Sequence, residues 1–294
     1  MHPSRRPPSH AYSEQAISAL ACPHCGSPLV QGDGSFLCTN RHSFDVAKQG
    51  YVALLGAASR TDTADSPDMV SARVDFLGAG HYARIAGALA EAVVRAGASA
   101  ATVAGPVLEI GAGTGYYLGA VLDGLGPGGS GIALDSSKYA ARRAAADPRV
   151  VSAVADAWSP LPVRSGAVRA VLSVFAPRDP AQITRVLAPG GVLGVVTPEP
   201  SHLAELREQL GMLTVDDGKA ERIAVAFAGL LDPTTRERVE FQMPMSHRDV
   251  SALVRMGPSA RHLDPADLAG TIARLPESVT VTASVTVTVL AKTA

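Results

Sequence analysis

Aromatic residues, cysteines and excess charge are all scarce in this sequence. Phe, Trp and Tyr make up 4% of the 294 residues, so the hydrophobic core must be built mainly from Ala, Val and Leu. Lys and Arg number 26 against 27 Asp and Glu, which excludes a histone-like protein that binds through bulk positive charge. A local basic cleft is still compatible with this balance.

Long apolar runs are lacking as well. No segment offers about 18 uninterrupted apolar residues, so we expect no membrane span. The first residues, MHPSRRPPSHAYSEQ, are basic, but no apolar run of the signal-peptide type follows them. Apolar residues at 47% and charged residues at 18% supply a core, whereas disorder needs the opposite bias. We therefore expect a soluble cytoplasmic protein with one large domain and a smaller module.

The three cysteines all lie between residues 22 and 38. An odd number in one short stretch argues against a disulfide framework. Cys22-x2-Cys25 and Cys38-x3-His42 instead form two ligand pairs, and three thiolates with one imidazole suit tetrahedral Zn²⁺. Four protein ligands leave no position for a substrate water, so we expect the zinc to be structural. The alternative is three buried free thiols beside a surface histidine.

Composition and pattern divide the chain into four segments. We expect a flexible N-terminus over residues 1–20, a zinc-binding module over 21–56, a linker with helices over 57–104 and a larger domain over 105–294. Within the zinc-binding module, a glycine-rich turn at Gly32–Gly34 predicts a small hairpin. A helix is expected to begin at Ser66, followed by Pro67 in its first turn.

The large domain alternates strands with helices, which predicts a parallel sheet covered on both faces. The final strands, Val239–Met243 and Ser278–Leu290, add a closing hairpin, and the Val–Thr alternation of the second predicts one buried face. Together they give a Rossmann-like sheet of seven strands in an α/β fold. The other five expected strands lie at residues 107–110, 131–135, 149–154, 167–174 and 191–197.

A glycine triplet follows the first of these strands in Val107-Leu-Glu-Ile-Gly111-Ala-Gly113-Thr-Gly115. The G-x-G-x-G spacing differs from the dinucleotide fingerprint and offers a weaker cradle for a pyrophosphate, which disfavours NAD. Asp135, at the end of the next strand, suits the two hydroxyls of a ribose, and Asp156 suits an adenine amino group. The set fits S-adenosylmethionine and a class I methyltransferase; a purely structural turn is the alternative.

Particular motifs then resemble the bacterial 23S rRNA (guanine-N1)-methyltransferases, a family that includes macrolide (tylosin)-resistance enzymes of actinomycetes. The resemblance runs from about residue 20 to the end of the chain and combines a zinc module with the methyltransferase core. It is carried by Cys22-Pro-x-Cys25, Arg41-His-Ser-Phe-Asp45, Ala47-Lys-Gln-Gly-Tyr51-Val, Gly80-His-Tyr82, Gly115-Tyr-Tyr117, Val174-Phe-Ala-Pro177-Arg, Thr197-Pro198, His202-Leu and Met256-Gly-Pro258.

The resemblance implies methyl transfer from S-adenosylmethionine to N1 of a guanine in a 23S rRNA hairpin, before or during ribosome assembly. It implies RNA recognition by the zinc-binding module, a homodimer, and a role in either macrolide resistance or housekeeping. It adds Tyr82 and His202 to the cofactor pocket. Without the resemblance, the simpler interpretations are core packing for Tyr82 and a surface position for His202. The expected cofactor residues are Tyr82, Glu109, Gly111, Gly113, Gly115, Tyr116, Asp135, Asp156 and His202.

Guanine N1 lies on the Watson–Crick edge and carries a proton, so the base must be unpaired or flipped and the proton removed. Phe175 could stack on the guanine or simply be buried. The rigid turn at Pro177 could offer carbonyl groups to its amine, and Asp179 is the third catalytic candidate. The sequence assigns no general base.

An RNA hairpin requires phosphate contacts, for which Arg41, Lys48, Arg60 and Arg73 are the candidates, although exposed basic residues are usually only solvated. Two alternatives remain. One is a methyltransferase that acts on a small natural-product substrate, with the zinc-binding module as a lid. The other is a non-catalytic zinc-ribbon protein, which the intact glycines, Asp135 and Asp156 disfavour.

Overall fold

The computed structural model describes residues 12–98, 104–207, 209–212 and 218–293. Residues 1–11 of the expected flexible N-terminus lie outside this part of the chain. For the rest of that segment the expectation was wrong, because α1 (Glu14–Ala19) forms there. The Ser13 side chain caps α1 by accepting from the Ala16 N–H, and the helix buries Ile17. A capping serine and an apolar face were enough to order this stretch.

The zinc-binding module contains a small antiparallel sheet in the order β1–β2–β3. The predicted hairpin is present: β1 (Leu29–Gln31) pairs with β2 (Ser35–Cys38), and β2 pairs in turn with β3 (Ser43–Asp45). The next strand, β4 (Tyr51–Ala53), leaves this sheet and pairs in parallel with β7 (Val150–Val154). The module is therefore joined to the large domain by backbone hydrogen bonds.

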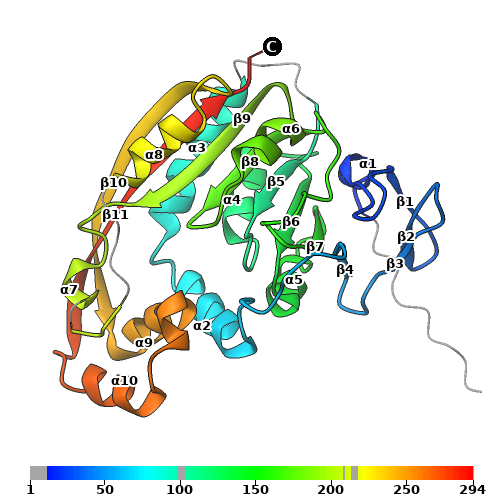
Figure 1. Cartoon of the computed structure of the whole chain (residues 1–294). Coiled ribbons are helices and arrows are strands. Elements are labelled where there is room, and N and C mark those ends of the chain that lie inside the picture. Colours follow the sequence, from blue (N-terminus) through cyan, green and yellow to red (C-terminus); the bar gives the residue numbers. More distant parts are fainter. Residues whose placement is uncertain (1–11, 99–103, 208, 213–217, 294) are drawn as a thin grey trace, which may run out of the picture.

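Across the described residues, the large sheet has the order β10-β11-β9-β8-β5-β6-β7-β4, and Figure 1 shows β10 and β4 at its opposite edges. The seven expected strands are present, and β4 adds an eighth at one edge. The strands from β9 to β4 are parallel, and the long hairpin of β10 and β11 adds antiparallel pairing beside β9. The remaining strands are β5 (Val107–Ile110), β6 (Gly131–Asp135), β8 (Val168–Val174), β9 (Leu187–Pro198), β10 (Asp232–Ser246) and β11 (Ser278–Ala291).

The predicted start of a helix at Ser66 is confirmed. Ser66 caps α2 with Pro67 in the first turn, and Ser246 forms a capping box with Asp249 at α9. No helix in the described ranges is long and apolar enough to cross a membrane. The helices are α2 (Pro67–Gly78), α3 (Ala83–Ala98), α4 (Tyr116–Leu125), α5 (Lys138–Ala144), α6 (Pro180–Val186), α7 (Ala204–Arg207), α8 (Lys219–Ala226), α9 (His247–Met256), α10 (Pro265–Ile272) and the 3-10 turn η1 (Pro258–Arg261).

Two hydrophobic clusters fill the space on either side of the sheet. One packs α2, α3, α4, α9 and α10, and the other packs α1, α6 and α8.

The expectation of one buried face on β11 was wrong over its second half, because Ser284, Thr286 and Thr288 are buried as well as the valines between them. β11 lies between β9 and β10 inside the sheet, and the Glu199 carboxylate accepts from the Thr286 hydroxyl. Position inside the sheet, and not polarity, therefore sets the burial of these residues.

Candidate functional site

The glycine turn after β5 is built so that side chains could not replace its glycines. Gly111, Gly113 and Gly115 all have φ between 53° and 78°, the left-handed region that favours glycine. A Cβ on Gly111 would lie 2.7 Å from the Ala176 Cβ, and one on Gly113 would lie 3.2 Å from the Arg73 Cδ. The turn therefore presents bare backbone at the carboxyl end of β5, just before α4.

The two predicted acids end neighbouring strands at the same edge of the sheet. Asp135, at the end of β6, accepts from the backbone N–H groups of Gly113 and Ser137, both at 2.8 Å. Burial raises the pKa of Asp135, and these two hydrogen bonds only partly oppose it. Asp156, just after β7, accepts from the N–H groups of Arg60 and Trp158. Burial raises its pKa too, but those hydrogen bonds and that of Ser159 outweigh burial, so the net shift is downward.

A cavity of about 510 Å³ opens beside these acids. Its lining joins the ends of β5, β6 and β7 with the first part of the linker. Of the predicted cofactor residues, Gly111, Asp135 and Asp156 line it directly, together with Arg60, Trp158 and Pro177. The cavity therefore lies where a nucleoside would reach both carboxylates.

Glu109 and Tyr116 lie beside the glycine turn and outside the lining of this cavity. The Glu109 carboxylate is 1% exposed and accepts from the Leu118 N–H at the start of α4. Burial raises its pKa to about 8. Tyr116 begins α4, and its ring packs against Tyr117 with centroids 5.2 Å apart. The Glu109 hydrogen bond therefore ties the end of β5 to the start of α4, on either side of the turn.

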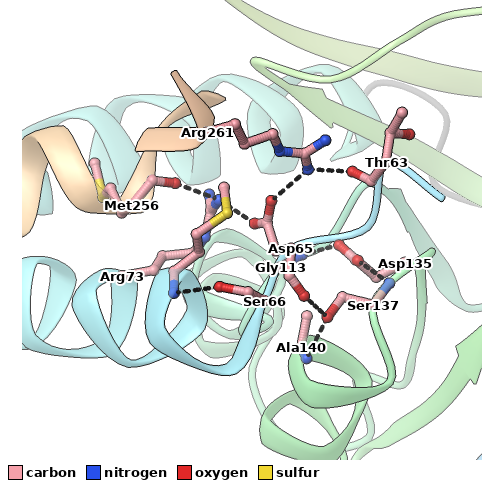
Figure 2. Close-up of polar contacts among 11 residues, drawn as sticks. Thr63, Asp65, Ser66, Arg73, Gly113, Asp135, Ser137, Ala140, Met256 and Arg261 are labelled. Atoms are coloured by element: carbon pink, nitrogen blue, oxygen red, sulfur yellow. Dashed lines mark hydrogen bonds and ion pairs between the residues drawn. The ribbon is translucent and has the colours of Figure 1, made fainter. Parts of the chain in front are cut away.

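A strap formed by residues 57–66 crosses the carboxyl end of the sheet. Asp65 accepts from Arg73 of α2 at 2.6 Å and pairs with Arg261 of η1 at 3.5 Å. Figure 2 shows Asp65 between these two arginines, with its backbone carbonyl accepting from the Ser137 hydroxyl. Arg73 also donates to the Met256 carbonyl at the end of α9. The strap is therefore tied to α2, η1 and the start of α5, and through Arg73 to the end of α9.

Three rings meet at the carboxyl end of β8. The Tyr82 hydroxyl lies 3.1 Å from the His202 Nε2, and the Phe175 ring lies 6.2 Å from Tyr82 and 5.9 Å from His202. The Ser284 N–H donates to the His202 Nδ1, so the ring proton is on Nε2 and points to the Tyr82 hydroxyl. Burial lowers the pKa of His202 to about 4 and raises that of Tyr82. Phe175 is 43% exposed with φ 52°, a strained conformation for a non-glycine residue.

The other two catalytic candidates have different surroundings. Pro177 lines the cavity beside Asp135 and Asp156. Asp179 caps α6, where its carboxylate accepts from the Ala181 and Gln182 N–H groups. The geometry gives Asp179 a structural use and places it outside the cavity lining.

The four predicted metal ligands converge. Their ligand atoms lie within 4.8 Å of one another, with Cys25 Sγ 3.7 Å from Cys38 Sγ. The His42 Nδ1 lies 3.5 Å from Cys22 Sγ and 3.4 Å from Cys38 Sγ. A tetrahedron with Zn–S bonds of about 2.3 Å places two sulfurs about 3.8 Å apart, so the donor set fits zinc. His24 is not part of this group; its ring stacks on Phe44.

The four RNA-binding candidates differ in exposure and in partners. Arg41 and Lys48 are exposed on the zinc-binding module. Arg60 is exposed but pairs with Asp62 at 2.9 Å. Arg73 is partly buried and bound to Asp65 and Met256, so it is not available to a phosphate in this conformation.

Sequence reasoning missed Asp65 of the strap, its partner Arg261, and Trp158. Trp158 is the only tryptophan and is 75% exposed at the cavity. Its place two residues after Asp156 could have singled it out. Asp65 and Arg261 meet from positions far apart in the chain, so no local pattern links them. The polar composition of residues 57–66 predicted a linker and gave no sign that it lines a cavity.

The sheet order and the site define the class of protein. Six parallel strands and a closing antiparallel hairpin, with a glycine turn after β5 and acids after β6 and β7, make this a class I S-adenosylmethionine-dependent methyltransferase fold. Residues 20–61 match the family described as RlmA, N-terminal, a zinc ribbon. A 23S rRNA (guanine(748)-N1)-methyltransferase of Streptomyces fradiae is 46% identical over 277 residues, 94% of this chain and 98% of its own. The chain belongs to the 23S rRNA (guanine-N1)-methyltransferase family, as the sequence motifs indicated.

The chain is similar to two further proteins. A protein of Micromonospora griseorubida, named provisionally as a 23S rRNA (guanine-N1)-methyltransferase, is 44% identical over 90% of this chain and 95% of its own. Among solved structures, a protein of Bacillus halodurans described as a presumed methyltransferase aligns with 68% of this chain and 99% of its own. That alignment has 14% identity and a TM-score of 0.46.

Proposed function

We propose that this chain transfers the methyl group of S-adenosylmethionine to N1 of a guanine in a 23S rRNA hairpin. The observation that carries the proposal is 46% identity over 94% of the chain to an enzyme named for that reaction. The structure supports it, because the glycine turn, the two acids and the ring cluster lie at one edge of the sheet. A small-molecule substrate has no such specific support.

The nucleoside cavity suits the cofactor on its donor set. Asp135 would accept from the ribose hydroxyls and Asp156 from the adenine amino group, while the bare backbone of the glycine turn permits close approach. When bound, S-adenosylmethionine supplies an electrophilic methyl group on its sulfonium. In the zinc-binding module, Cys22, Cys25, Cys38 and His42 would hold a structural Zn²⁺.

The ring cluster would hold the target base. Phe175 offers an exposed face for stacking on a flipped guanine, a contact of a kind worth about 1–3 kcal/mol per base. His202 orients the Tyr82 hydroxyl by donating to it, and Tyr82 is then free to donate in turn. These contacts would fix the plane of the base beside the glycine turn.

The side chains of this ring cluster have pKa values that make them poor general bases for the N1 proton at neutral pH. A histidine with a pKa of about 4 is a weak base, and a tyrosine with a raised pKa stays protonated. We infer that Tyr82 and His202 position groups by hydrogen bonding and act on the proton only indirectly. The rate of methylation should then show no inflection between pH 5 and 7 from His202.

We further propose that the zinc-binding module (residues 21–56) recognises the RNA and that residues 105–294 are the methyltransferase domain. The enzyme would act in the cytoplasm as a homodimer, on rRNA before or during ribosome assembly. The open edge of β10, which has one strand partner among the described residues, offers backbone groups for contact between subunits. Native mass spectrometry of the zinc-loaded protein tests the homodimer.

The experiment for the main proposal is methyl transfer to defined RNA. The zinc-loaded protein is incubated with labelled S-adenosylmethionine and a protein-free 23S rRNA transcript, and the label is mapped by mass spectrometry. The expected product is N1-methylguanine at one hairpin position. The matched control is a transcript in which that guanine is replaced by adenine. Label on no RNA nucleotide would overturn the proposal, and label on another atom would correct it.

A further inference from the structure

Arg73 has an unusual position for a residue of a surface helix. Its Nη2 donates to the Asp65 carboxylate and to the Met256 carbonyl. Its Nε is buried and has no hydrogen-bond partner among the described residues. That Nε would lie 3.5 Å from a Cβ built on Gly113, so it faces the glycine turn. A buried guanidinium N–H without an acceptor is costly unless a ligand supplies one.

The order of the strands indicates which part of the cofactor would meet Arg73. Asp156 follows β7 and Asp135 ends β6, so adenine and ribose would lie over these two strands. The 5′ substituent must then cross β5, whose glycine turn touches Arg73, on the way to the ring cluster at β8. The amino-acid arm of the cofactor would therefore branch off beside Gly113.

Charge supports the same assignment. Glu109 and Asp135 flank the turn, and Arg73 is the cation that acts to lower the pKa of both. An amino-acid carboxylate placed among these acids needs a nearby positive group, and a guanidinium suits it best. The arginine is also fixed in place, since Asp65 binds it while pairing with Arg261 on the other side (Figure 2).

We propose that Arg73 binds the carboxylate of the cofactor's amino-acid arm through its buried Nε, and that Asp65 of the strap is the positioning residue that holds Arg73. This assignment rests on the proposed function and replaces the expectation that Arg73 contacts RNA phosphate. The strap then supports the cofactor-binding arginine in addition to joining the two parts of the chain.

The test uses two ligands that differ only in the carboxylate. Isothermal titration calorimetry measures the affinity of the zinc-loaded protein for S-adenosylmethionine and for decarboxylated S-adenosylmethionine. The wild type should prefer the intact cofactor, and Arg73→Gln should weaken its binding by about 10- to 100-fold, the loss expected for a charge-assisted hydrogen bond. Binding of the decarboxylated ligand should change less than about threefold, so the preference should nearly vanish. Asp65→Asn should lose part of the preference for the intact cofactor.

The matched control is Arg95→Gln, which removes an exposed arginine of α3 that pairs with Glu91 and should leave the ratio of the two affinities unchanged. An equal loss for both ligands in Arg73→Gln would overturn the inference, because it would show a general structural role. Equal wild-type affinity for both ligands would overturn it too, while leaving the proposed function intact. Wild-type binding to neither ligand would overturn both.

Discussion

Glu109 is the residue whose protonation should control stability. Burial raises its pKa to about 8 from an ordinary value of 4.5, so the folded state favours the protonated form. This contribution to stability is fully present below about pH 4.5 and is lost as the pH rises toward 8. We expect the free energy of unfolding to fall by about 1 kcal/mol per pH unit within this range.

Glu109→Gln should remove that pH dependence, because the amide imitates the protonated acid and can still accept from the Leu118 N–H. Urea unfolding at about pH 5 and about pH 8.5 measures the free energy of unfolding near the two ends of this pH range. Between these two pH values, the free energy of unfolding should fall more for the wild type than for Glu109→Gln. Glu91→Gln, at an exposed position on α3, is the control and should run parallel to the wild type. Wild-type-like pH dependence in Glu109→Gln would contradict the prediction.

Phe175 should matter for the substrate and not for the fold. Its ring is 43% exposed and its φ of 52° is strained, so Phe175→Ala should change the melting temperature little. Loss of a stacked base should lower kcat/KM for RNA by about 10- to 100-fold. Affinity for S-adenosylhomocysteine should remain near that of the wild type. Val225→Ala, which truncates an exposed apolar residue on α8, is the control; equal effects of the two would contradict a role in stacking.

At the residue scale, the sequence predicts a site where the contributing residues are near one another along the chain. Cys22, Cys25, Cys38 and His42 follow metal-ligand spacing, and the structure brings them together. The role of Arg73 could not be read in this way. Its partners Asp65 and Met256 lie in different segments, and its basic side chain looks like any solvated arginine until the fold surrounds it. The capping use of Asp179, by contrast, could have been read from the sequence, because Pro180 follows it as Pro67 follows Ser66.

At the scale of elements, zinc should hold the N-terminal module together. The strands β1, β2 and β3 are three or four residues each and give the module little core of its own. Cys38→Ser should therefore abolish zinc binding and remove hydrogen-exchange protection from residues 20–61. Protection in β5 and β8 should persist, because the core of the large sheet does not depend on the metal.

His24→Ala is the matched control for this change. His24 lies between two ligands but stacks on Phe44 outside the donor set, so the variant should keep one zinc per chain. Zinc content by atomic absorption and exchange by mass spectrometry give the two readouts. Loss of zinc in His24→Ala, or unchanged protection of residues 20–61 in Cys38→Ser, would contradict the structural role.

The elements themselves were largely predictable, since glycine turns, caps and apolar alternation all act locally. Ser66, for example, begins α2 with Pro67 in its first turn, as the sequence indicated. Two features were not predictable, because they depend on partners distant in sequence. β4 joins the large sheet by pairing with β7, and β11 buries its hydroxyls because it lies inside the sheet. A short strand or a Val–Thr alternation carries no signal of what packs against it.

At the scale of the whole molecule, a net charge of −1 requires any RNA contact to be local. The zinc-binding module is itself balanced, with Arg41 and Lys48 against Asp33 and Asp45. Attraction between the module and RNA must therefore come from the placement of its cations and not from their number. Arg41 is accessible to an RNA phosphate, because it is exposed in the turn between Cys38 and His42.

Binding of the rRNA hairpin should therefore depend steeply on salt, with Arg41 contributing to that slope. Arg41→Glu should weaken RNA binding and reduce the slope of log K against log salt by about one, since one phosphate contact is lost. Fluorescence anisotropy from about 50 to about 200 mM salt measures both. Arg95→Glu, at the far end of α3 and paired with Glu91, should leave the slope unchanged. Equal slopes for Arg41→Glu and Arg95→Glu would mean that Arg41 makes no phosphate contact, and RNA recognition would then have to be sought on the large domain.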